Sequence, residues 1–471
     1  MKSEDEKFKV GNKTISNMMN PADHSATENA VRDRIQSTRG ENAGNKLKHP
    51  SYGQTAPRNL SELDVSHSLI TDLMLRHLRI HGVSTLSSLT SQMKLSTSII
   101  KALFEEMRKQ QWIEVKGSDG LDYSFGLTTA GRALAAERSQ TCNYTGPAPV
   151  SLNDYSRAVK TQVAKVKINR AGLRAAFFDL VVSDSFLDRL GPALISQQSL
   201  FLYGPTGNGK TSYSERLLRT YDDSVILPYA VEVDGQIVIV YDPVIHTRLP
   251  VEPRHLDPRW VVCRRPCVTA GGELTAASLD LRFDGNSGAY VAPLQMRANN
   301  GILIIDDFGR QTMSARELLN RWILPLDRRV DYLTLSYGMK FQIPFELLVV
   351  FSTNLDPSEL LDMAFLRRLP NKVYVGDIDD ETFDLIFERE TAKQNIACDP
   401  GGAESLRRLC KLHGGKELRA CYPIDICRIL VWIGEYENRS AVEATHEALE
   451  RAVGLYFAQR SGHAPGGEVA G

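Results

Sequence analysis

Gly204-Pro205-Thr206-Gly207-Asn208-Gly209-Lys210-Thr211 is the stretch that decides the fold, and it follows the apolar run Ser199 to Tyr203. In the spacing G-x-x-x-x-G-K-[ST], glycines let backbone N–H groups curl around a phosphate, the lysine reaches the outer phosphate oxygens and the hydroxyl binds Mg²⁺. The apolar run predicts the strand that feeds this loop. The residues that follow, Ser212 to Arg219, predict a helix whose positive N-terminal end faces the same phosphates. We therefore expect residues 204–212 to bind a nucleotide, with Thr211 as a metal ligand.

The composition is that of a globular protein without a strong charge preference. Its 471 residues exceed the size of a single core, which predicts two or three domains. The formal net charge of −1 gives no overall field that would recruit nucleic acid or an acidic membrane surface. No apolar run approaches the ~18–20 residues that span a bilayer, and the charged start, residues 1–7, lacks the apolar core of a signal peptide. We therefore expect a cytoplasmic protein with no membrane partner.

The seven cysteines are scattered along the chain. The closest pairs, Cys263 with Cys267 and Cys421 with Cys427, lack the C-x-x-C spacing of a zinc or redox site. We therefore expect reduced thiols, most of them in the core, and no cysteine-held metal.

A second apolar run, Gly301 to Ile305, ends in the two carboxylates Asp306 and Asp307. A continuous apolar run is expected of a buried parallel strand. Asp306 is then placed to hold Mg²⁺ beside Thr211, and Asp307 to orient and deprotonate the attacking water. Together with the phosphate loop, this strand predicts hydrolysis of the nucleotide.

A third apolar strand, Leu347 to Phe351, ends in Ser352-Thr353-Asn354. Asn354 is there placed to hydrogen-bond the γ-phosphate or the lytic water. An apolar strand followed by Ser-Thr-Asn resembles sensor 1 of AAA+ ATPases, which implies ATP and Mg²⁺ as the bound groups.

The stretch Ala364-Phe365-Leu366-Arg367-Arg368 resembles the part of AAA+ proteins that presents an arginine finger to the neighbouring subunit. A guanidinium suits this role because it spreads transition-state charge over the γ-phosphoryl oxygens. The resemblance implies a ring of copies of this chain, with a hexamer as the expected form and Arg367 or Arg368 acting in trans. The sequence leaves open which of the two is the finger.

A predicted hairpin indicates which branch of the AAA+ proteins the chain resembles. Tyr332 to Ser336 and Lys340 to Ile343 alternate around Tyr337-Gly338-Met339, directly before the sensor 1 strand. This hairpin resembles the pre-sensor insertion of the AAA+ branch that includes MoxR-like chaperones, magnesium chelatase and bacterial enhancer-binding activators. The sequences of residues 306–311 and 319–323 resemble those of a bacterial group of predicted MoxR-like ATPases with suspected chaperone activity. This resemblance implies a protein client. The resemblance covers roughly residues 173–439.

A long segment separates the phosphate-loop helix from Asp306, with hairpin-like patterns at Ala230 to Val240 and Gly271 to Leu294. Such patterns of alternating apolar residues and turn residues predict β-hairpins. We expect this segment to be an insertion that contacts the substrate.

The region from Asp380 to Gln459 is largely helical by its periodicity and fits the AAA+ lid. Many relatives carry Pro-Arg-Asp at the start of the last lid helix, where the arginine senses the phosphates, whereas this chain has Pro423-Ile424-Asp425. Because Ile424 cannot contact phosphate, we expect either Arg428 or Arg419 to substitute, or a slow, switch-like ATPase.

The part before the core shows three short helical periods and then two strands, Trp112 to Lys116 and Tyr123 to Leu127. Helix, helix, helix and hairpin resemble a winged helix-turn-helix, which implies DNA binding with Thr97, Ser98 and Lys101 at the start of the recognition helix. Basic and acidic residues are, however, equally frequent between Ser61 and Gln140, whereas DNA-binding modules usually carry a positive excess. DNA binding and protein docking both remain open for this part.

The sequence as a whole predicts an α/β P-loop NTPase of the AAA+ type that remodels or assembles a macromolecular client. The alternative is an ATP-controlled, DNA-binding regulator; a P-loop kinase fits the lid and the arginine pair poorly. The predicted segments are a disordered arm (1–59), a winged-helix-like domain (60–140), a linker (141–172), the AAA+ core (173–375), a helical lid (376–460) and a disordered tail (461–471).

Overall fold

The computed structural model describes residues 55–119, 122–165, 168–250, 256–360, 363–439 and 441–457. The chain divides by its contacts into residues 1–48 and 49–471, and all described residues belong to the second unit. The predicted disordered arm, apart from residues 55–59, and the whole predicted tail lie outside the described residues.

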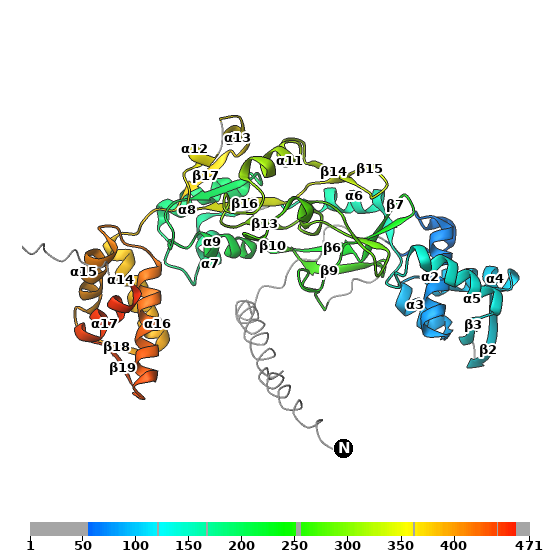
Figure 1. Ribbon diagram of the computed structural model, residues 1–471, viewed down its shortest axis with the longest axis horizontal. Helices are drawn as coiled ribbons and strands as arrows, with labels where there is room; N and C mark the ends of the chain where they lie inside the picture. Colours follow the sequence, from blue (N-terminus) through cyan, green and yellow to red (C-terminus); the bar gives the residue numbers. More distant parts are fainter. Residues whose placement is uncertain are drawn as a thin grey trace, which may run out of the picture. The chain divides into compact units, whose positions relative to one another are not determined.

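A five-stranded, all-parallel sheet carries the phosphate loop (Figure 1). Its strand β5, which precedes the loop, lies between the strand that ends at Thr353 and the one that ends at Tyr374. The three central strands β13, β16 and β5 are almost entirely buried, as expected for a parallel sheet covered on both faces, whereas the edge strand β17 buries only Val373. In sheet order the strands are β10 (Cys267–Ala270), β13 (Ile302–Ile305), β16 (Leu348–Thr353), β5 (Leu200–Tyr203) and β17 (Asn371–Tyr374).

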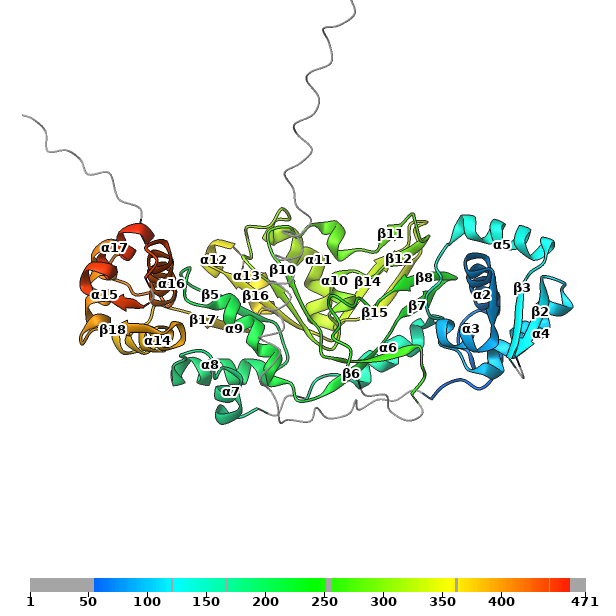
Figure 2. The same cartoon turned by 90° about the horizontal axis from the view of Figure 1, so that it is seen from below.

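Helices cover both faces of this parallel sheet, so that it forms the middle of three layers (Figures 1 and 2). Leu200 and Leu202 share a core with α7 and α8, whereas Phe201 between them shares a core with Trp322 of α11. This alternation follows from the period of two in a strand. The helices of the core are α7 (Arg170–Ala176), α8 (Asp184–Ile195), α9 (Lys210–Arg216), α10 (Leu294–Arg297), α11 (Ala315–Arg328), α12 (Pro357–Leu360) and α13 (Met363–Arg368), with 3-10 turns at Leu217–Thr220 and Ala276–Leu279.

A second five-stranded sheet is mixed rather than parallel, and most of it lies in the predicted insertion. Its β7–β8 hairpin closes through Asp234 and Gly235, which both have positive φ, the geometry of a tight two-residue hairpin turn. A further antiparallel pair, β6 (Ser224–Pro228) with β9 (Trp260–Arg264), shares its apolar core. In sheet order the mixed sheet contains β11 (Arg282–Asp284), β12 (Ala289–Val291), β8 (Gln236–Ile239), β7 (Ala230–Val233) and β4 (Val150–Ser151).

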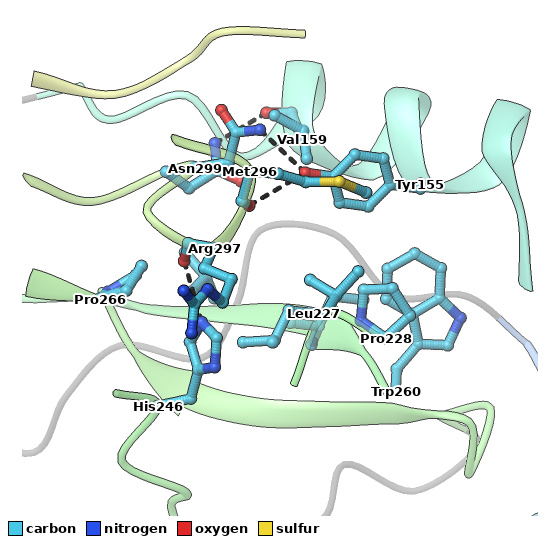
Figure 3. A pocket seen from close by; sticks show the side chains of 14 residues that line it. Tyr155, Val159, Leu227, Pro228, His246, Trp260, Pro266, Met296, Arg297 and Asn299 are labelled. Atoms are coloured by element: carbon cyan, nitrogen blue, oxygen red, sulfur yellow. Dashed lines mark hydrogen bonds between the residues drawn. The ribbon is translucent and has the colours of Figure 1, made fainter. Parts of the chain in front are cut away.

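The segment predicted as a linker, 141–172, contains ordered elements that pack on the core. Strand β4 joins the mixed sheet, and α6 (Leu152–Thr161) follows it. The Tyr155 hydroxyl donates to the Met296 carbonyl over 3.2 Å and accepts from Asn299 Nδ2 over 2.8 Å (Figure 3). The sequence does not predict these elements. Pro and Gly at the start of the segment indicate a local break, but they give no sign that the strand after it pairs with β7, far along the chain.

The space between α6, β6 and β9 that Figure 3 shows is a cavity of about 20 Å³. A cavity of this size holds about one water molecule. It is therefore a packing feature and has no room for a substrate.

The predicted hairpin before β16 is present as β14 (Val330–Thr334) and β15 (Lys340–Pro344). Its tip is tied to the mixed sheet, because Ser336 N donates to the Tyr290 hydroxyl over 3.0 Å and the Tyr337 hydroxyl donates to Asp234 over 2.6 Å. The three residues between β15 and β16 are held in their middle, where Glu346 N donates to Asn299 Oδ1 over 2.8 Å and Glu346 O accepts from Asn300 N over 2.6 Å.

The N-terminal unit, 60–141, contains helices and a three-stranded antiparallel sheet, which includes the predicted hairpin of β2 and β3. Its core is continuous with the mixed sheet through Ala230, Ile237 and Ala289. The elements are a 3-10 turn (Leu60–Glu62), α2 (His67–His81), β1 (Val83–Thr85), α3 (Leu86–Met93), α4 (Thr97–Lys109), β2 (Ile113–Asp119), β3 (Asp122–Leu127) and α5 (Thr129–Thr141).

The C-terminal part is a helical unit with its own apolar core, as the periodicity predicts (Figure 2). In the described residues no helix combines the length and apolarity needed to cross a membrane. The elements are α14 (Asp380–Gln394), β18 (Ile396–Cys398), α15 (Gly402–Gly414), α16 (Cys421–Tyr436), β19 (Val442–Ala444) and α17 (His446–Tyr456).

Candidate functional site

The phosphate loop needs its glycines for two physical reasons. Gly204, Gly207 and Gly209 all have positive φ, which other residues adopt only with strain. A Cβ on Gly204 would also come within 2.3 Å of the Val375 carbonyl oxygen. The loop leads directly into α9, which begins at Lys210, two residues before the predicted helix start.

The Lys210 ammonium lies inside the loop. Its Nζ donates to the carbonyl oxygens of Gly204 and Pro205, each over 2.8 Å. Burial lowers the pKa of Lys210, although the carboxylates of Asp306 and Asp307 act in the opposite direction. A phosphate beside Nζ would restore the stability of the charged form, because an opposite charge favours it.

Thr211 and Asp306 come together at the end of β13. The Thr211 hydroxyl donates to Asp306 Oδ2 over 2.8 Å. Both side chains present oxygen atoms, the ligand type that Mg²⁺ prefers, and Mg²⁺ normally adds water and nucleotide phosphate oxygens to one or two protein ligands. No cluster of three or more His, Cys, Asp or Glu side chains suited to a metal occurs among the described residues. The pair therefore fits a Mg²⁺ ion that arrives with a nucleotide.

Asp307 has a strained backbone, with φ of 49° in a non-glycine residue. Its N–H donates to Asp306 Oδ1 over 3.1 Å, and the next peptide is fixed to β16 because Phe308 N donates to Ser352 O over 2.7 Å. Strain of this kind persists where the surroundings over-determine the backbone, and it is frequent at active sites. The turn directs the exposed Asp307 side chain into the same cavity as Lys210.

Asn354 follows β16, the strand between the phosphate-loop strand and the strand of Asp306. Its Oδ1 atom is buried and has no hydrogen-bond partner among the described residues. A buried polar atom without a partner is costly. A bound water or phosphate in the cavity would provide the missing partner.

These side chains line one cavity of about 430 Å³ between the parallel sheet and the lid. A cavity of this volume is in the range of small-molecule sites. The chain has the P-loop NTPase fold. The α/β fold class predicted from the sequence is thereby confirmed, and the helical lid follows the sheet in the chain.

Comparisons with known proteins add little beyond this P-loop fold. Residues 379–455, within the lid, match a family described as a domain of unknown function, DUF8689. No curated protein matches the chain. Similar solved structures include the RuvB Holliday junction branch migration motor of Thermotoga maritima, 13% identical over 62% of this chain and 72% of that one, with a TM-score of 0.33. A variant of that motor is 14% identical over 60% and 73% of the two chains, with a TM-score of 0.36.

The lid of the P-loop NTPase reaches the phosphate loop through the residues just before and at the start of α16. Ile424, where the sequence resemblance leads one to expect an arginine, lines the cavity with a hydrocarbon side chain. Arg419 Nη1 donates to Thr206 Oγ1 over 3.2 Å. Arg428 instead pairs with Asp425 one turn earlier, over 3.2 Å.

The two candidate finger arginines lie on α13 in different environments. Arg368 is half-buried, and its Nε pairs with Asp327 Oδ2 over 2.9 Å. Arg367 is exposed and has no ion-pair or hydrogen-bond partner within the described ranges. Neither arginine lines the cavity of its own chain.

Part of the cavity wall carries no sequence motif. It comprises Leu180 and Val181 before α8, Tyr213 of α9, and Ile386, Arg389 and Glu390 of α14. These residues lie about 200 positions apart in the chain. No local spacing connects them, so only the folded structure reveals that they share a site.

Proposed function

We propose that this protein binds ATP with Mg²⁺ and hydrolyses it. The observation that carries the proposal is the convergence of Lys210, the Thr211–Asp306 pair and the unpartnered Asn354 Oδ1 on one cavity. Kinases and simple binding proteins also carry phosphate loops. Placing a second carboxylate and a sensor amide beside the metal pair favours attack by water, because both groups suit the positioning of a water molecule.

In this proposal each side chain has a separate task. Lys210 releases the carbonyls of Gly204 and Pro205 and stabilises the β- and γ-phosphate charge. Thr211 and Asp306 hold Mg²⁺, which supplies charge neutralisation at the phosphates when it is bound. Asp307 accepts a proton from the attacking water, and Asn354 orients that water through its Oδ1 atom.

We further propose that Arg367, rather than Arg368, acts as the finger in a neighbouring copy of the chain. A finger must leave its own subunit and reach a phosphate elsewhere, and an exposed guanidinium without a partner pays no penalty for this. Arg368 would first have to break its pair with Asp327. The assembly that this requires is a ring, with a hexamer as the expected form.

Hydrolysis at such interfaces would serve to remodel a macromolecular client, in the manner of a MoxR-like chaperone. The support for a protein client is the mixed sheet, which joins the hairpin and the N-terminal unit to the core through shared apolar residues. Such a body can deliver a movement to a bound protein because interiors transmit strain. We place this protein in the cytoplasm.

The alternative, a DNA-binding regulator that acts through the winged-helix-like part, is weaker. At the start of α4, the Ser96 and Ser98 hydroxyls donate to the carbonyl oxygens of Pro57 and Arg58, over 3.2 and 2.6 Å. Hydroxyls whose proton is used in this way can no longer donate to base edges, and the charges of this part balance. We therefore favour protein docking for residues 60–140.

The proposal is tested by comparing wild type with Asp307→Asn. The variant should keep ATP affinity within about threefold and lose about 10²- to 10⁴-fold in turnover, because only the base is removed. Light scattering after size-exclusion chromatography, with and without ATP, measures the assembly. Wild-type turnover in the variant would remove Asp307 from the mechanism, and a monomer under all conditions would remove the trans arginine.

A gel-shift titration of the full chain against duplex DNA at two salt concentrations separates the two candidates. Tight binding with a steep salt dependence would favour the regulator, because phosphate contacts release counterions. Absence of binding at low salt would leave the protein-docking role.

A further inference from the structure

We propose that the side chains of Gln311 and Thr353 are positioning residues for hydrolysis, because they hold the turn that presents Asp307 to the attacking water. This inference rests on the proposed function, in which Asp307 is the base. It adds two residues that are not among the described residues lining the cavity. Residues 306–309, which form this turn, are called the base turn below.

The base turn has a backbone that needs outside support. Asp307 has φ of 49°, in the left-handed region that is unfavourable for a residue with a side chain. The Asp307 side chain is exposed, so its own packing does not compensate. The buried Phe308 ring packs against Phe351, with ring centroids 5.0 Å apart, but a packed ring does not fix the rotation of the peptide groups before it. Hydrogen bonds to the backbone have to do so.

Gln311 bridges the base turn from both ends. Its Oε1 accepts from Gly309 N over 2.8 Å, and its Nε2 donates to Asp306 O over 2.7 Å. The Asp306 carbonyl belongs to the peptide group that leads into Asp307, and Gly309 lies two residues after Asp307. One amide thus uses a donor and an acceptor together to fix the chain on each side of the proposed base.

Thr353 connects the base turn to the end of the sensor strand β16. It is 1% exposed, and its hydroxyl donates to Phe308 O over 2.7 Å and accepts from Leu355 N over 3.1 Å. Phe308 directly follows Asp307, and Leu355 directly follows Asn354. A single hydroxyl therefore sets the position of the proposed base relative to the amide that orients the water.

The other hydrogen bonds of the base turn fix it to the parallel sheet. Asp306 N donates to Ala270 O at the end of β10, over 2.8 Å. Phe308 N donates to Ser352 O of β16, over 2.7 Å. Because these bonds are independent of the two bridges, loss of a bridge should leave the metal ligand Asp306 in place and misplace the Asp307 carboxylate.

Such a misplacement should affect the chemical step rather than binding. A shift of about 1 Å in a reacting group costs about 100-fold in rate. Nucleotide affinity instead depends on Lys210 and the Thr211–Asp306 pair, which neither bridge contacts through a side chain. We therefore expect a lower kcat at unchanged affinity.

The test uses substitutions that remove hydrogen bonds at nearly constant volume. Thr353→Val removes the hydroxyl and Thr353→Ser keeps it, whereas Gln311→Met keeps the length of the side chain without its amide. Thr312→Val is the matched control, because the exposed Thr312 hydroxyl donates to Gly272 O, outside the base turn, over 3.4 Å. The full chain is assayed for ATP turnover with Mg²⁺ and for AMP-PNP affinity by displacement of a fluorescent ADP. Thermal melts check that each variant is folded.

Thr353→Val and Gln311→Met should each lower kcat about 10- to 100-fold and change AMP-PNP affinity by less than about threefold. Thr353→Ser and Thr312→Val should stay within about twofold of wild-type turnover, because both keep the bridges of the base turn.

A double variant separates positioning from a merely structural role. If Gln311 acts through Asp307, adding Gln311→Met to Asp307→Asn should lower turnover by less than about a further twofold. A side chain that only stabilises the fold would lower turnover by the same factor in both backgrounds.

Equal losses in the two backgrounds, or wild-type turnover in Gln311→Met, would overturn the role of Gln311. If Gln311→Met does not fold, Gln311→Ala, whose shorter side chain cannot clash, takes its place in both backgrounds. Equal turnover of Thr353→Val and Thr353→Ser would overturn the role of Thr353. Failure of the proposed function looks different, because wild type would then not hydrolyse ATP, or Asp307→Asn would be as active as wild type.

Discussion

The two sheets of this protein each have five strands, but only the parallel sheet gathers the residues of the candidate site. In the parallel sheet the carboxyl ends of β5, β13 and β16 meet at one edge, which gathers the phosphate loop, Asp306 and Asn354. In the mixed sheet antiparallel pairs alternate their ends, so that its loops leave from both edges.

This difference indicates that the parallel sheet positions the residues of the nucleotide site, whereas the mixed sheet holds parts of the chain together. Parallel strands place the ends of distant chain segments together without any loop having to be long. The mixed sheet instead buries apolar residues against the hairpin and the N-terminal unit. Changes in the first sheet should therefore alter nucleotide chemistry, and changes in the second should alter stability.

The largest effect is expected at Lys210, where the phosphate loop that follows β5 of the parallel sheet enters α9. Lys210→Ala should lower nucleotide affinity about 100- to 1,000-fold, because it removes a buried charge contact to phosphate. Calorimetric titration with ADP measures the loss. Lys340→Ala, an exposed lysine on β15, is the control, and an equal loss there would show that the effect of Lys210→Ala is not specific to the phosphate loop.

A large effect on stability alone is expected beside the mixed sheet. The Arg259 guanidinium pairs with the fully buried Asp257 over 2.7 Å and donates to the Pro149 carbonyl before β4. Arg259→Ala should cost about 3–5 kcal/mol, because it leaves a buried charge unpaired. Denaturant unfolding measures this, with the exposed Arg264→Ala as the control. A loss of nucleotide affinity in folded Arg259→Ala would contradict the division of roles.

A smaller effect on stability is expected at acidic pH. It arises at His246, which lies outside the parallel sheet. Burial lowers the pKa of His246 below its ordinary 6.5, against the opposing effects of the Arg297 carbonyl and the Asp242 carboxylate. The unfolded chain then binds the proton more readily, so stability should fall as the pH drops below 6.5, by at most about 1.4 kcal/mol per pH unit for one group.

His246→Gln should flatten this pH dependence in thermal melts between neutral pH and the lowered pKa. It should not remove it, because burial also lowers the pKa of His77 in α2. An unchanged slope in His246→Gln would show that His246 does not carry the effect.

The smallest effect is expected at the contact between the hairpin and the mixed sheet. Tyr290→Phe removes the hydroxyl that accepts from Ser336 N, which should cost about 1 kcal/mol and leave ADP affinity unchanged. Tyr332→Phe, which removes an exposed hydroxyl on the same hairpin, should cost less. If the two variants are equally stable, the tip contact is not a structural tie.

The sequence predicts those features whose residues lie within a few positions of one another. The phosphate loop, the Asp306 strand and the Asn354 strand each carry their residue types within a few positions, and a parallel P-loop fold then brings their ends together. The same reasoning fails for β4 and α6, because pairing of β4 with β7 depends on residues about 80 positions apart.

The candidate site shows the same limit. Ile424 is recognisable as a departure from a motif, yet nothing in the spacing decides between Arg419 and Arg428. In the structure Arg419 lies beside the phosphate loop, because the neighbouring Ala420 N donates to Asn208 Oδ1, whereas Arg428 pairs with Asp425. The unusual backbone of Asp307 also has no sequence signal, because an aspartate after a strand adopts positive φ only when its surroundings impose it.

The short connection between β15 and β16 links the hairpin to the strand that precedes Asn354. From Pro344 to Leu348 the chain spans roughly 14 Å at full stretch, and Glu346 is bonded on both sides in the middle of it. A shift of β16 along its axis would therefore strain the hydrogen bonds of Glu346 or be passed on to the hairpin, which couples the position of Asn354 mechanically to the mixed sheet.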